Sequence, residues 1–240
     1  MSRAEIAEAL DRLLERKNAL ARNAAAAPLA QRLQELRAWQ AERLARTYAD
    51  IRRDPVAGDA VSFFLTDLYG AQDFTERDQN VARAWRLLKR ALPPRMLEVL
   101  SLAMELDVLS AELDLEMARR LTPGPLSAKA YADAYRAVGR REARRRQIGL
   151  IVEIGAALGR AVRTPLVPLA LRAAHAPAHV AGFAVLQDFL ERGFAAFGKL
   201  PHPRQLFTII EEREMRLMQS LFEGGTIAAE EPPVAAGGSA

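Results

Sequence analysis

The chain has 240 residues, of which half are hydrophobic, and its formal net charge is +4. Such a chain can bury a sizeable core, which excludes a disordered or fibrous protein. It contains no cysteine, which excludes a disulfide framework, a cysteine-ligated metal site and a thiol nucleophile, and we expect a cytoplasmic location. Alanine, leucine, arginine and glutamate dominate, so we predict an all-α bundle of about eight to ten helices.

The first part of the chain predicts two helices that form a hairpin. Ser2 and Glu5 have the spacing of a capping box, and apolar residues then recur on one helical face to about residue 23. Pro28 begins a second helix. We expect this helix to end before Pro55, because the residue that precedes a proline is disfavoured in the α region.

The next stretch, from Val61 to Trp85, mixes aromatic side chains with acids and an arginine, and we interpret it as the point where several helices meet. A carboxylate, a phenol and a guanidinium beside an apolar wall can orient a ligand, although such a group of residues more often holds a loop in place. We call this candidate binding or structural site the aromatic cluster, and it consists of Phe63, Phe64, Asp67, Tyr69, Asp73, Arg77 and Asp78.

The strongest break in the pattern is the segment 122–125, with the sequence Thr-Pro-Gly-Pro, which follows a long predicted helix, 95–121. We predict one all-helical domain over residues 1–224, and this segment is a candidate boundary between two lobes, 1–122 and 126–224. Residues 225–240 are rich in Ala, Gly, Pro and Glu and have little to bury, so we predict a disordered tail.

Charged residues of the long helix and of the helix near residue 150 predict a buried ion-pair network. The acids Asp107 and Asp114 fall among apolar residues, and a buried carboxylate must be paired or its pKa rises. We expect them to meet arginines, in a network of Asp107, Asp114, Arg146, Glu153 and Arg160; a ligand-binding or catalytic acid is the alternative. The other acidic stripe of the long helix is expected to be solvated and consists of Glu98, Glu105, Glu112 and Glu116.

The later helices carry three further signals. Ser127 is expected to cap a helix that runs to Val138, and Gly139 to kink the chain. Gly155 and Gly159 have the spacing of a close helix crossing.

His175 and His179 are four residues apart, but we expect Pro177 to separate two helices between them. We therefore predict no metal site and no cofactor.

Five arginines lie between residues 140 and 146 and suggest nucleic-acid binding as a third functional hypothesis. On a helix these side chains would point around most of the circumference, and no helix-turn-helix spacing accompanies them. The sequence therefore does not favour nucleic acid as the partner.

The block Phe63-Phe64-Leu65-Thr66-Asp67-Leu68-Tyr69-Gly70, followed by Asp73-Phe74 and Arg77-Asp78, resembles a signature of a helical proteobacterial family without an assigned activity. In that family a similar Phe-Phe-Leu-x-Asp-Leu-Tyr-Gly block precedes an Arg-Asp pair. The segment 186–194 is similar to a later part of the same pattern, so the resemblance covers about residues 30–222. It implies a bacterial cytoplasmic protein and no particular reaction.

These observations favour a non-enzymatic protein-binding, adaptor or homo-oligomerising module. We assign no catalytic residue, because the chain has no nucleophile elbow, phosphate-binding loop or dinucleotide fingerprint, and we expect no membrane span. The alternative is a bundle that binds a small molecule or lipid, either as a binding protein or as an enzyme. Its pocket would be lined by Phe183, Phe194 and Phe197 and ringed by Asp67, Tyr69, Arg77 and the buried acids.

Overall fold

The computed structural model describes residues 2–65, 94–121, 124–164, 166–181 and 184–227. Within these ranges the protein is all-α, with ten helices and no strand, which confirms the predicted class. The helices are α1 (Arg3–Ala24), α2 (Ala27–Thr47), α3 (Ala49–Arg52), α4 (Gly58–Phe63), α6 (Pro94–Ala118), α7 (Ala128–Val138), α8 (Arg141–Val162), α9 (Leu166–Val180), α10 (Ala184–Gly198) and α11 (Pro203–Phe222).

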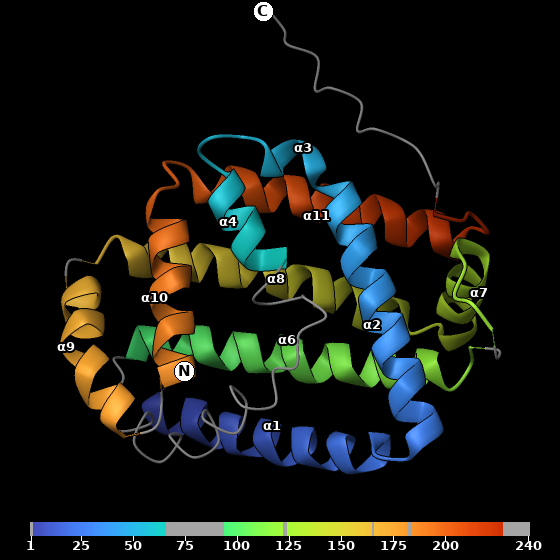
Figure 1. Ribbon diagram of the computed structural model, residues 1–240, viewed down its shortest axis with the longest axis horizontal. Helices are drawn as coiled ribbons and strands as arrows, with labels where there is room; N and C mark the ends of the chain where they lie inside the picture. Colours follow the sequence, from blue (N-terminus) through green and yellow to red (C-terminus); the bar gives the residue numbers. More distant parts are fainter. Residues whose placement is uncertain (1, 66–93, 122–123, 165, 182–183, 228–240) are drawn as a thin grey trace, which may run out of the picture.

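Four long helices form a layer at the centre of the molecule. Figure 1 shows α1, α6, α8 and α11 side by side in this order, and each neighbouring pair is in contact. Helix α2 crosses this layer near one end and α10 near the other. Helix α9 packs mainly on α10 at one edge of the molecule, and α7 lies at the opposite edge against α6 and α11.

The helix ends follow the local signals in several places. Ser2 Oγ accepts from the backbone N–H of Glu5, and Glu5 Oε2 accepts from that of Ser2 at 2.6 Å, which is the predicted capping box. Ser127 Oγ accepts from the N–H of Ala130 at the start of α7. Gly139 has φ +69° and does more than kink the chain, because it ends α7 and lets α8 start in a new direction.

The expectation that Pro177 separates two helices is wrong, because α9 continues through it to Val180. Proline cannot donate a hydrogen bond to the carbonyl of Ala173. Both residues are exposed, so water can satisfy that carbonyl, and the helix ends only three residues later. His175 and His179 consequently lie on one helix, one turn apart.

The largest core lies where α4, α8, α10 and α11 meet. Phe197, with 1% of its surface exposed, sits between Phe63 and Phe207 at ring-centroid distances of 6.0 and 5.9 Å. Gly155 of α8 is buried under Phe207, and a Cβ there would overlap the Phe207 ring. The predicted close crossing is therefore the one between α8 and α11.

A second core joins α2, α6, α7 and α11 through Leu36, Met117, Tyr131 and Met218. Helices from both sides of segment 122–125 thus contribute to shared apolar clusters. Among the described residues, none of the helices combines the length and the apolar run that crossing a bilayer requires. Most of the predicted tail, from residue 228 onward, lies outside the described residues.

Candidate functional site

The described part of the aromatic cluster belongs to the core. Phe63 and Phe64 are 8% and 6% exposed, and the Phe63 ring lies 5.2 Å from that of Phe189. Gly193 of α10 leaves room for the ring, because a Cβ there would lie 2.8 Å from it. The other members of the cluster lie outside the described residues, and they are Asp67, Tyr69, Asp73, Arg77 and Asp78. A binding role for the cluster stays a prediction.

The structure brings together Arg146 and Glu153 but does not join them to the two aspartates. Arg146 donates to Glu153 at 2.6 Å and to Glu105 of α6 at 2.8 Å, on a partly exposed surface. Hydrogen bonds to Glu105 and then Glu153 raise the pKa of Arg146. Arg160 is exposed and forms no ion pair with another described residue.

Asp107 and Asp114 pair instead with cations of α1 and α2. These two helices do not lie antiparallel along each other as the predicted hairpin would, because α2 crosses the layer that contains α1 (Figure 1). Asp107 lies 2.5 Å from Lys17 Nζ of α1, while Asp114 accepts from Gln40 Nε2 at 3.1 Å and lies 3.6 Å from Arg37 Nε. The predicted single network is therefore wrong in its pairing. Periodicity identified the two faces of α6 but not which neighbour each face meets.

The acidic stripe of α6 is exposed at Glu98, as predicted, and partly exposed at Glu105 and Glu116, but it is buried at Glu112. Glu112 is 8% exposed and accepts from Arg16 of α1 at 2.8 Å, and Arg140 lies 3.9 Å away. Arg140 in turn donates to Glu116 at 2.6 Å. The stripe meets basic residues of α1 and of the start of α8, because α6 is covered on both sides.

The run of five arginines is divided among separate intramolecular contacts. Arg140 pairs with Glu116, Arg141 lies over the ring of Phe222, Arg144 contacts Tyr135 and Met117, Arg145 pairs with Glu142, and Arg146 pairs with Glu105 and Glu153. Arg144 is only 4% exposed. The other four are exposed, and three of these are paired with carboxylates, which offsets part of their positive charge. Nucleic-acid binding by this run stays a prediction.

One buried set of hydrogen-bonded side chains was not predicted from the sequence. Glu214 of α11 accepts from Arg43 at 2.5 Å and from the Tyr48 hydroxyl at 2.9 Å, both on or next to α2. Burial alone would lower the pKa of Arg43, but Glu214 raises it; burial, followed by Glu214, raises the pKa of Tyr48. Arg43 follows the buried Leu36 by seven residues and Glu214 follows Phe207 by seven, so both stand on apolar faces.

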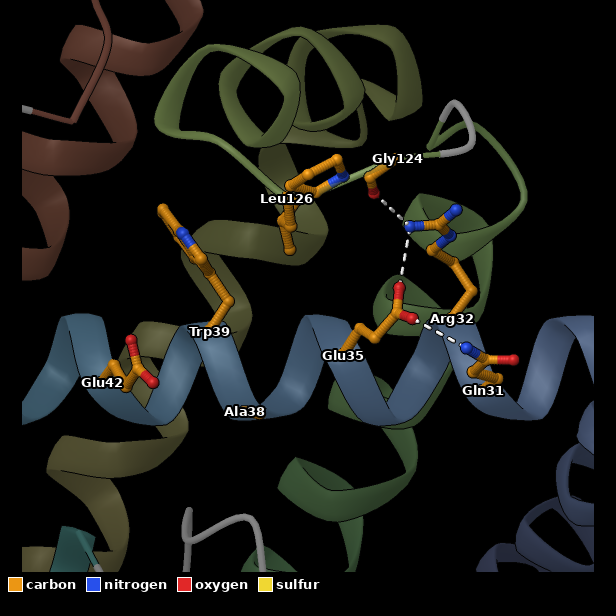
Figure 2. Close-up of a pocket in the computed structure, with 9 residues that line it drawn as sticks. Gln31, Arg32, Glu35, Ala38, Trp39, Glu42, Gly124 and Leu126 are labelled. Atoms are coloured by element: carbon orange, nitrogen blue, oxygen red, sulfur yellow. Dashed lines mark hydrogen bonds and ion pairs between the residues drawn. The ribbon is translucent and has the colours of Figure 1, made fainter.

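A groove of about 560 Å³ lies open to solvent between α2 and residues 124–126 (Figure 2). Several polar groups that line the groove are hydrogen-bonded to one another. Arg32 donates to Glu35 at 2.7 Å and to the carbonyl of Gly124 at 2.9 Å. Trp39 stacks on Tyr131 at 4.4 Å.

Two of the three phenylalanines of the predicted ligand pocket lie in the described residues. Phe197 fills the core rather than lining a cavity, Phe194 is half-buried on α10, and Phe183 lies outside the described residues.

The outer face of α9 is an exposed apolar stripe. Leu169 is 63% exposed and Val180 is 91% exposed, and Ala173 and Ala176 between them are also exposed. These four residues, which we call the α9 stripe, are spaced four, three and four apart, so they share one helical face. The opposite side of α9 packs on α10.

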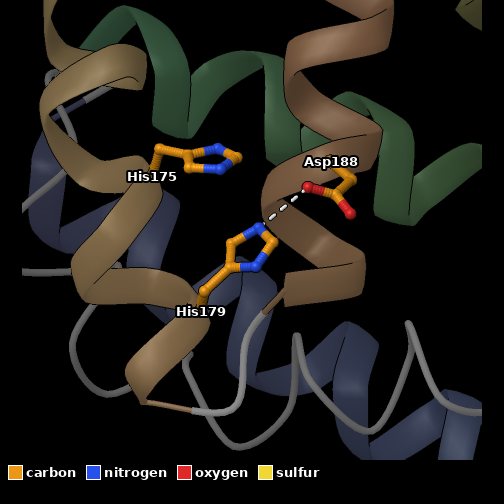
Figure 3. A group of neighbouring side chains, drawn as sticks. All are labelled: His175, His179 and Asp188. Atoms are coloured by element: carbon orange, nitrogen blue, oxygen red, sulfur yellow. Dashed lines mark hydrogen bonds and ion pairs between the residues drawn. The ribbon is translucent and has the colours of Figure 1, made fainter.

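Toward α10, the helix α9 presents its two histidines to acids (Figure 3). His179 Nε2 lies 2.9 Å from Asp188 Oδ1, and His175 Nδ1 lies 2.9 Å from Glu191 Oε1. The two imidazole centroids are 4.3 Å apart. This grouping was missed because Pro177 was expected to break the helix.

Comparison with known proteins identifies a family to which the chain is similar. A family model described as a domain of unknown function (DUF8198) matches residues 19–227. No curated protein matches the chain significantly, and no solved structure does.

Proposed function

The chain belongs to the DUF8198 family, a domain of unknown function. Because the family assigns no activity, we base the function on the structure, and we propose that the protein is a non-enzymatic module that self-associates through the α9 stripe. The observation that carries the proposal is the exposure of Leu169 and Val180 on a regular helix face. Contiguous exposed apolar side chains on a surface helix are typical of interaction sites.

The spacing of the stripe is suited to another helix. Apolar residues that alternate four and three positions apart form a seam that packs against a partner helix at a small crossing angle. Ala173 and Ala176 in the middle are small, so a second backbone can come close. Arg172 is the one residue of α9 with a permanent charge, so two copies of the helix bring little like-charge repulsion.

The order of side chains along the stripe favours a second copy as the occupant. In an antiparallel pair with its two-fold axis between residues 174 and 175, Leu169 lies opposite Val180 and Ala173 lies opposite Ala176. Each large side chain then packs against a large one and each small against a small one. A self-complementary patch of this kind is what a two-fold symmetric dimer requires.

The ion pairs support a binding role over a catalytic one. Asp107, Asp114 and Glu153, the acids considered for chemistry, each lie beside a cationic side chain. A carboxylate engaged by a cation of the same chain is the arrangement of a structural ion pair.

The test is the oligomeric state as a function of concentration. A contact of one helix per copy falls below the ~1,200 Å² of a standard interface, so we expect a weak dimer whose population rises with protein concentration. Sedimentation velocity over a concentration series should show this equilibrium for the native chain. The variant Val180→Glu should remain a monomer throughout, because it places a charge in the apolar seam.

Val56→Glu is the matched control, since Val56 is also an exposed large apolar side chain, at 45%, but lies outside α9. It should dimerise like the native chain. A native chain that is monomeric at every concentration, or a Val180→Glu variant that still dimerises, would overturn the proposal. Loss of dimer in both variants would show that the effect of Val180→Glu is not specific to the α9 stripe, and it would overturn the assignment of the interface to that stripe.

A further inference from the structure

We propose that His175, His179 and Asp188 form a binding site for a zinc ion that links α9 to α10. One ligand atom from each of these residues lies within 4.8 Å of the other two. The two histidines come from adjacent turns of α9 and the carboxylate comes from α10 (Figure 3). Two histidines four residues apart on a helix can both bind one metal ion.

The geometry needs only small side-chain adjustments to accept the ion. Ligand atoms about 2.0–2.2 Å from a tetrahedral zinc ion are about 3.3 Å from one another. His179 Nε2 and Asp188 Oδ1 are already 2.9 Å apart. All three side chains are accessible to solvent, so the ion has an entry path and the side chains can rotate.

A second layer of contacts holds His175 in a metal-binding orientation. Its Nδ1 lies 2.9 and 3.1 Å from the two carboxylate oxygens of Glu191, which leaves Nε2 for a metal ion. Metal-binding histidines commonly donate their other N–H to a carboxylate in this manner. Glu191 also accepts from Gln187 at 2.8 Å.

Gln187 fixes this second layer to the fold. It is 5% exposed and donates to the backbone carbonyl of Leu171 at 2.8 Å as well as to Glu191. The bond to Leu171 holds α10 in register with α9 within the same turn that carries His175. The acids and the imidazoles therefore face one another because a buried side chain sets their alignment.

The ligand chemistry selects the type of ion. Two imidazoles and one carboxylate suit zinc and related transition metals, whereas magnesium and calcium prefer oxygen ligands alone. Three protein ligands leave one coordination position for water. Neither the histidines nor Asp188 belongs to the α9 stripe, so this proposal does not depend on self-association.

The experiment is isothermal titration of tag-free, EDTA-treated full-length protein with zinc chloride. We expect one equivalent of zinc to bind saturably, and magnesium chloride to give no such binding. His179→Ala should weaken zinc binding by at least tenfold, and Glu191→Gln by about 10–100-fold, because second-layer contacts of metal sites have effects of that size. Circular dichroism of each variant checks that it is folded.

His202→Ala is the control, because His202 precedes α11 and is the remaining histidine of the chain. It should bind zinc like the native protein. Zinc should also raise the melting temperature of the native chain and of His202→Ala but not that of His179→Ala, since an ion bound to the folded state alone stabilises it. Absence of saturable zinc binding, or equal binding by His179→Ala and the native chain, would overturn the proposal.

Discussion

At the scale of single residues, one oxygen atom of Glu214 is bound to two buried groups, the Arg43 guanidinium and the Tyr48 hydroxyl. The side chains of Arg43 and Glu214 are only 9% and 13% exposed. Removing one member of a buried pair is costly because the other charge stays away from water without a partner. This group therefore joins α11 to α2 more strongly than the many surface pairs join other helices.

We predict that Glu214→Ala lowers the free energy of unfolding by about 3–5 kcal/mol. Tyr48→Phe removes only one hydrogen bond and should cost about 1 kcal/mol. Urea denaturation measures both.

The control for these two variants is Lys129→Ala, because the pair Lys129–Asp133 is exposed. It should change the stability by less than about 1 kcal/mol. A loss for Glu214→Ala no larger than that for Lys129→Ala would contradict the structural importance of the buried pair.

At the scale of elements, α8 and α11 approach closely because α8 lacks a side chain where Phe207 lies. Gly155 sits under the Phe207 ring, Gly159 lies near Pro203, and Gly149 has open space around its Cα. The three glycines of one helix therefore differ in their surroundings although the sequence presents them alike. Of the three, only Gly155 is required by packing.

We predict that Gly155→Ala lowers the free energy of unfolding by about 1–3 kcal/mol, because the new methyl group overlaps the Phe207 ring. Gly149→Ala should raise it by up to about 1 kcal/mol, since alanine is the better helix former and meets no atom there. Thermal or urea unfolding of the two variants makes the comparison within one helix. A stabilised Gly155→Ala would show that the two helices can move apart at little cost.

At the scale of the whole molecule, the contacts across segment 122–125 bear on the choice between one domain and two lobes. Trp39 of α2 stacks on Tyr131 of α7, and α6 packs between α1 and α8. Helices of both proposed lobes would thus lose core contacts if either unfolded alone. We propose that residues 1–224 behave as one cooperative unit.

This proposal predicts a single unfolding transition. In the variant Trp85→Phe, Trp39 is the remaining tryptophan, so its fluorescence reports the contact between α2 and α7. Its urea transition should coincide with that of the helix signal in circular dichroism. Two separated transitions would favour independent lobes.

Much of the fold could be predicted because helix ends depend on neighbouring residues. Ser2 and Ser127 cap helices through bonds to atoms three residues away, and apolar periodicity indicates which face turns inward. The candidate sites were less predictable. The partner of Asp107 is Lys17, ninety residues earlier, and no spacing in the sequence relates them.

The sequence by itself determined the helical class, several of the helix ends and the residues that must be buried or paired, since these depend on interactions within a few turns. The tertiary structure decided which charges meet, that α9 continues past Pro177 and that its outer face remains uncovered. Those outcomes depend on how whole helices pack, and a proline that local chemistry disfavours is tolerated where its neighbours face water. The same packing brought His175, His179 and Asp188 together.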